Sequence, residues 1–211
     1  AAAATARPAA GSTGRRPLPV RRGRRAPSGT TTRLTTTKPM VTLTRLQSGT
    51  GTFALALVRA PSAGDLALGC VLQDATGAEA VVQAHGDRTA FPRASATPLV
   101  RLTARPEGDV VTIDLRQVRS LRRALVYGYS PSVSSLTWDG VLSATTYGGA
   151  RIEIPFDRRP FSGTMAMVSI YDVDGELVIR SEMEELYGPP EMAAIAYGYE
   201  VPWLDGRVPA S

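Results

Sequence analysis

The chain has 211 residues, and 43% of them are hydrophobic, a fraction typical of a soluble globular protein. Its longest apolar runs, such as Phe53–Val58, have the length of a β-strand and fall far short of the roughly 18 residues that a membrane-spanning helix needs. The formal net charge is +5, from 24 basic and 19 acidic residues, which by itself suggests a basic surface.

The positive charge is concentrated at the N-terminus. Residues 1–38 contain no acidic side chain, so 15 basic and 19 acidic residues remain in 39–211. The nine basic residues of this tail are Arg7, Arg15, Arg16, Arg21, Arg22, Arg24, Arg25, Arg33 and Lys38. Prolines and glycines separate them, and such a composition buries too little apolar surface to offset the entropy of ordering the chain. We therefore expect 1–39 to be a disordered basic tail and 40–207 to be one folded domain.

From Met40 onward, short alternating or apolar runs are separated by turn residues, as is typical of β-strands. We expect strands at 41–46, 52–58, 66–73, 78–83, 99–104, 110–115, 124–129, 141–146, 151–156, 165–171, 176–180 and 192–201. A helical turn is expected at 116–122 and a loop at 84–98. Asp174-Gly175, between two of the runs, predicts a type I′ hairpin turn. With no helix long enough for a parallel crossover, the pattern predicts an all-β protein, an antiparallel β-sandwich of two sheets, with a closed barrel as the alternative.

Catalytic chemistry has few candidate residues. Nucleophilic catalysis needs a nucleophile beside an oriented base, and the chain has one cysteine, Cys70, and one histidine, His85. Cys70 lies inside an apolar run, which predicts a buried, unreactive thiol, and His85 lies in the loop that follows 78–83. No phosphate-binding loop, nucleophile elbow or dinucleotide-binding motif is present. We do not expect an enzyme.

Three aspartates are the candidates for metal ligands. Asp65 precedes the expected strand 66–73, Asp74 follows it, and Asp87 lies in the loop after 78–83. Carboxylates near strand ends are suited to a hard cation such as Ca²⁺, which takes six to eight oxygen ligands. The alternative is that all three are solvated loop acids.

The order of several short motifs resembles that of the tellurium-resistance TerD family, and within it the TerA-like branch. The first motif is Asp65-Leu66-Ala67-Leu68-Gly69-Cys70, which is followed by a turn at Gly77 and by Val81-Val82-Gln83. Ile113-Asp114-Leu115, Gly149–Ile154 and Ala196–Tyr199 continue the resemblance, which covers roughly 40–207.

The resemblance implies a two-sheet β-sandwich that acts as a non-enzymatic binding module in bacterial stress responses, many members of which bind Ca²⁺ through acidic loops. In this chain Asp65 matches the first acidic motif, but Ala67 replaces its second aspartate and Arg88 follows Asp87 where a further acceptor would help. Because affinity follows the number and charge of the ligands, we expect no certain cofactor and, at Asp65, Asp74 and Asp87, a degenerate site that binds Ca²⁺ weakly or not at all.

We therefore expect a TerD-like stress-response binding or scaffold protein whose partners are other proteins of such a system. The alternative is a nucleic-acid-associated protein, in which the arginine-rich tail contacts phosphates in a salt-sensitive manner. The stretch that follows Arg25 is polar, whereas a secretion signal needs an apolar core, and one cysteine excludes an internal disulfide. A cytoplasmic protein is expected.

Overall fold

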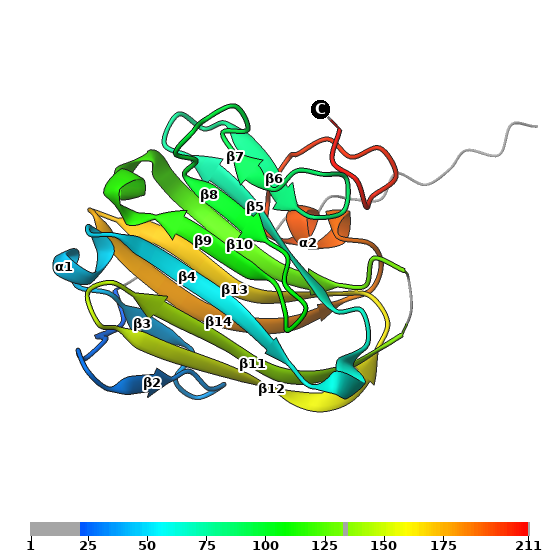
Figure 1. Ribbon diagram of the computed structural model, residues 1–211, viewed down its shortest axis with the longest axis horizontal. Coiled ribbons are helices and arrows are strands. Elements are labelled where there is room, and N and C mark those ends of the chain that lie inside the picture. Colours follow the sequence, from blue (N-terminus) through cyan, green and yellow to red (C-terminus); the bar gives the residue numbers. More distant parts are fainter. Residues whose placement is uncertain (1–21, 133–134, 211) are drawn as a thin grey trace, which may run out of the picture.

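The computed structural model describes residues 22–132 and 135–210, which form two seven-stranded sheets packed face to face (Figure 1). The first sheet contains, in spatial order, β1 (Arg24–Arg25), β3 (Met40–Thr42), β14 (Glu176–Leu186), β13 (Thr164–Val173), β10 (Leu121–Tyr129), β5 (Ala67–Asp74) and β6 (Glu79–Gln83). The second contains β2 (Thr31–Arg33), β12 (Arg151–Phe161), β11 (Leu136–Thr146), β4 (Thr52–Arg59), β9 (Val110–Asp114), β8 (Val100–Thr103) and β7 (Ala90–Phe91). The predicted all-β sandwich is confirmed.

Neighbouring strands run antiparallel, except for the two short parallel pairs β1–β3 and β2–β12. The helical elements are α1 (Arg45–Ser48), the 3₁₀ helices η1 (Pro61–Ala63) and η2 (Leu115–Ser120), and α2 (Glu191–Ala196). The helical turn expected at 116–122 corresponds to η2. Within the described ranges, none of the helices has the length and apolar character needed to cross a bilayer.

Period-two alternation builds the core between the sheets. Strand β4 of the second sheet turns Phe53, Leu55 and Leu57 inward, and β5 of the first sheet turns Leu68 and Leu72 toward them. All five are buried. Because burying one such side chain contributes about 1.5–3 kcal/mol, this shared apolar layer is what holds the two sheets together.

The hairpin between β13 and β14 has the predicted turn. Asp174 and Gly175 both adopt positive φ angles, 56° and 79°, as the two central residues of a type I′ turn must. The backbone N–H of Gly175 donates to the Asp172 carboxylate over 2.9 Å, so these acids have a structural role in the turn.

Residues 22–39, which the sequence predicts to be disordered, instead pack along one edge of the sandwich; residues 1–21 lie outside the described residues. This N-terminal segment adds β1 to the first sheet and β2 to the second, and it buries Ala26 and Leu34 in the core. The prediction failed because edge pairing uses backbone hydrogen bonds, which do not depend on side-chain composition. The burial of Ala26 and Leu34 adds apolar contacts to this pairing.

The C-terminal segment, residues 187–210, also corrects the prediction, since the strand expected at 192–201 is replaced by α2 and a loop. Ala193 and Ala194 are buried side by side whereas Met192 and Ile195 point outward, which is the spacing of a helix rather than of a strand. Over so short a window the two periods are hard to separate. Figure 1 shows α2 and the following loop beside β5, β6 and β10.

Candidate functional site

The three predicted metal ligands do not gather at one place. Asp65 lies just before β5 and Asp74 is its last residue, and because a strand rises about 3.3 Å per residue, they lie on the order of 20 Å apart or more. Asp87 lies beyond β6, whose antiparallel pairing with β5 brings it to the same end as Asp65. Within residues 22–132 and 135–210, no three Asp, Glu, His or Cys side chains are grouped so that they could hold a metal ion.

Each of these aspartates has a local role. The Asp74 carboxylate accepts hydrogen bonds from the backbone N–H groups of Thr76 and Ala78, each over 2.9 Å, and from the Thr76 hydroxyl. Desolvation acts to raise the pKa of Asp74, but these hydrogen bonds outweigh it and lower the pKa. Asp65 accepts from the Ser130 hydroxyl over 2.8 Å and from the Ser132 N–H over 2.9 Å. Asp87, on an exposed turn, is 3.8 Å from Arg93.

Cys70 and His85 lie in unlike environments. Cys70 is a fully buried free thiol, as predicted, and burial raises its pKa to about 12, so it is protonated at neutral pH. His85 lies in the exposed turn after β6, where its backbone carbonyl accepts a hydrogen bond from the Gln83 amide over 2.8 Å. Neither residue is placed as a nucleophile beside a base.

Arg123 is the residue that the sequence analysis missed most clearly. This buried arginine on the outer face of β10 donates to the backbone carbonyls of Tyr197 (2.8 Å) and Gly198 (2.6 Å). It also bonds the Glu79 carboxylate (3.2 Å), and its guanidinium lies 4.0 Å above the Tyr199 ring. Arg123 therefore fastens the C-terminal segment to the first sheet. The sequence offers two adjacent arginines, Arg122 and Arg123, at the start of an otherwise apolar strand, and only the structure shows which of them is buried.

Gln83 makes a second attachment on the same face. Its buried amide donates to the backbone carbonyl of Arg207 over 2.6 Å, and its oxygen accepts from the Tyr127 hydroxyl over 2.7 Å. The Tyr127 ring lies over Gly69 of the neighbouring strand, where any side chain would collide with it. Gly69 and Gln83, both in the motifs that carry the family resemblance, thus have structural roles beneath the C-terminal segment.

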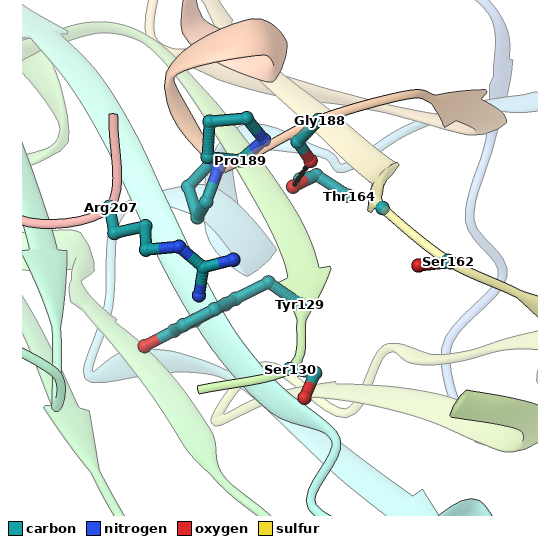
Figure 2. A pocket seen from close by; sticks show the side chains of 9 residues that line it. Tyr129, Ser130, Ser162, Thr164, Gly188, Pro189 and Arg207 are labelled. Carbon is teal, nitrogen blue, oxygen red and sulfur yellow. Dashed lines mark hydrogen bonds between the residues drawn. The ribbon is translucent and has the colours of Figure 1, made fainter. Parts of the chain in front are cut away.

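A pocket of about 140 Å³ opens where the C-terminal segment meets the ends of β10 and β13 (Figure 2). Its lining includes Tyr129, Ser130, Ser162, Thr164, Pro189 and Arg207. Figure 2 shows the Arg207 guanidinium directed toward Tyr129, with Ser130, Ser162 and Thr164 on the other side of the view. One cationic group and several hydroxyls thus converge on a space large enough for a small molecule.

The outward side of the C-terminal segment is apolar. Tyr187, Met192 and Ile195 are 80%, 40% and 46% exposed. Met192 and Ile195 share one face of α2, and Met192 lies against Gly188, next to Tyr187. We call these three residues the apolar ridge. Glutamates border the apolar ridge. Glu191 is the first residue of α2, and Glu184 accepts a hydrogen bond from the hydroxyl of Tyr197, the residue that follows α2.

Two tail arginines are used within the protein. Arg22 lies 3.0 Å from Asp174 and 3.3 Å from the buried carboxylate of Glu176, and Arg25 is 3.4 Å from Glu176. These ion pairs attach the N-terminal segment to the β13–β14 hairpin.

The chain matches no protein-family model and no curated protein. Among solved structures it is similar to the crystal structure of SAV2460, a protein of unknown function, with 17% sequence identity and a TM-score of 0.49. The match covers 72% of this chain and 99% of that chain. A likeness at this level assigns no function.

Proposed function

We propose that this protein is a non-enzymatic binding or scaffold protein of the TerD type, which acts in cytoplasmic stress responses by contacting other proteins. The sandwich agrees with the fold class that the resemblance implies. The observation that carries the proposal is the apolar ridge: three large apolar side chains stay exposed on a segment whose other side is fastened to the sheet by Arg123 and Gln83. Clustered exposed apolar residues are characteristic of interaction surfaces.

The charge around the ridge indicates the chemistry of the partner. Glu184, Glu185 and Glu191 lie on the elements that flank it, β14 and α2. An apolar centre with a charged rim favours a partner of complementary pattern. The proposed occupant is therefore a protein segment with apolar side chains flanked by Lys or Arg, rather than nucleic acid. In addition, Arg22 and Arg25 are engaged in ion pairs with Asp174 and Glu176.

The test places a photo-crosslinking amino acid at Ile195 in the full chain and identifies the cross-linked peptide after irradiation in cells. We expect the cross-linked peptide to be one segment with basic and apolar residues. A synthetic peptide of the same sequence should bind the purified chain, as measured by calorimetry. The double variant Met192→Glu/Ile195→Glu should weaken that binding at least about tenfold, since each lost apolar contact contributes about 1–2 kcal/mol.

Leu46→Glu is the matched control, because Leu46 is an apolar residue, 73% exposed, on α1 and outside the ridge. Equal loss in both variants would overturn the proposal, as would cross-linking only to a second copy of this chain. The titration is repeated with CaCl₂, and we expect the same affinity, because Asp65 and Asp74 flank β5 at opposite ends.

A further inference from the structure

We propose that the pocket beside Arg207 is a binding site for a small carboxylate that carries a hydroxyl or amino donor next to its acid group, that is, an α-hydroxy or α-amino acid. This inference goes beyond the proposed protein contacts and does not depend on them, because the pocket and the apolar ridge use different side chains.

The cationic side of the pocket is Arg207. Its backbone carbonyl is held by the buried amide of Gln83, which fixes the residue at the pocket wall. In the part of the chain that the structure describes, its guanidinium makes no hydrogen bond or ion pair, and its charge makes only a minor contribution to lowering the pKa of Asp205. A guanidinium with open donors, on a residue whose backbone is held in place, is suited to a carboxylate, which it binds through two parallel hydrogen bonds.

The other side of the pocket carries the hydroxyls of Ser130, Ser162 and Thr164. The Ser130 hydroxyl gives its proton to Asp65 over 2.8 Å, and the buried Thr164 hydroxyl gives its proton to the Gly188 carbonyl over 3.1 Å. The Thr164 oxygen therefore offers lone pairs to the pocket, whereas the Ser130 oxygen also lies 3.4 Å from the Ser132 hydroxyl. Behind Ser130, the Asp65 carboxylate adds negative charge. A ligand that fits has its acid group at Arg207 and a hydroxyl or ammonium donor toward Thr164.

The volume of the pocket suits a small ligand. A volume of about 140 Å³ equals that of four or five waters at about 30 Å³ each. Cofactors and drug-sized ligands need about 300 Å³ or more. Acids of the size of glycolate or glycine therefore match the space.

To test this, the full chain is titrated with glycolate, glycine, acetate and inorganic phosphate, and the chemical shifts of its backbone amides are followed by NMR. We expect glycolate and glycine to bind about tenfold more tightly than acetate, since one added hydrogen bond contributes about a factor of ten. Equal binding of all four, or tightest binding of phosphate, would overturn the proposal in favour of a general anion site.

Two variants assign the two sides of the pocket. Arg207→Gln should weaken glycolate and glycine at least about tenfold, whereas Arg122→Gln, an exposed arginine at the far end of β10, should change neither. Asp65→Asn should weaken glycine more than glycolate, because only glycine carries an ammonium group. Thermal unfolding verifies that Arg207→Gln is folded. Unchanged affinity in a folded Arg207→Gln protein would contradict the site.

Discussion

The outer faces of the two sheets differ in how the protein uses them. On the first sheet, Tyr127 and Tyr129 of β10 are buried under the C-terminal segment, which Arg123 and Gln83 fasten through hydrogen bonds. On the second sheet, the cross-strand pair of Val58 and Val141 joins β4 and β11, and Val58 remains 57% exposed. The first face is therefore a second core, whereas the second face follows the ordinary pattern of an antiparallel sheet with one solvated side.

This difference shows how a β-sandwich can form a pocket while its strands remain regular. The pocket exists because a chain segment is laid over one sheet and leaves a gap at its border, near Thr164 and Arg207. Buried polar groups hold that segment in one position, since leaving such a group unpaired costs about 1–3 kcal/mol.

The largest effect is expected where the C-terminal segment is fastened. Arg123→Ala should lower the free energy of unfolding by about 3–5 kcal/mol, because it leaves the Glu79 carboxylate without its buried partner and two carbonyls without a donor. Urea unfolding measures this. The neighbouring Arg122→Ala, on an exposed position, should change stability by no more than about 0.5 kcal/mol. Similar losses in the two variants would mean that Arg123 does not fasten the segment.

Added side-chain bulk on each outer face compares the two directly. Gly69→Ala should destabilise the protein by about 1–3 kcal/mol, because the added Cβ collides with the buried Tyr127 ring. Ala56→Val adds bulk to the open face of β4 and should stay within about 0.5 kcal/mol of the natural protein. Thermal unfolding of both variants measures the contrast, and a large loss in Ala56→Val would show that something covers the second face.

The smallest effect concerns an ion pair at the end of β9, in the second sheet. Hydrogen bonds from Arg116 (2.8 and 2.9 Å) hold the pKa of Asp114 at about 2. A lowered pKa in the folded state stabilises the protein above the unfolded value of about 3.9, and this contribution is lost as the pH falls from about 4 toward 2. Because the Arg116 side chain is largely exposed, we expect only about 1 kcal/mol.

Asp114→Asn should therefore reduce the loss of stability between pH 4 and pH 2, as followed by urea unfolding at each pH. The contribution of Asp114 should also shrink in high salt, whereas that of the buried Arg123–Glu79 pair should not. If the stability contribution of Asp114 did not change with salt, the Asp114–Arg116 pair would not differ from the buried Arg123–Glu79 pair in the way expected of an exposed pair.

Among the candidate site residues, the burial of Cys70 was predictable from its apolar neighbours. The hairpin turn at Asp174-Gly175 was also predictable, because Asp and Gly are residues that adopt the two positive φ angles of a type I′ turn. The three aspartates were placed correctly next to strand ends, but the length of β5 separates Asp65 from Asp74. Arg123, Gln83 and Arg207 were missed, because their roles depend on partners between 44 and 124 residues away in the chain.

The sequence by itself determined that alternating side chains from Met40 onward form strands, and that these strands build two layers around one apolar core. It did so because period-two alternation is a local signal that survives without any knowledge of neighbours. Only the tertiary structure decided that residues 22–39 add strands to both sheets and that 187–210 covers one face. Edge pairing through the backbone and long-range polar contacts leave no periodic trace in the chain, so they emerge only once the sheets exist to receive them.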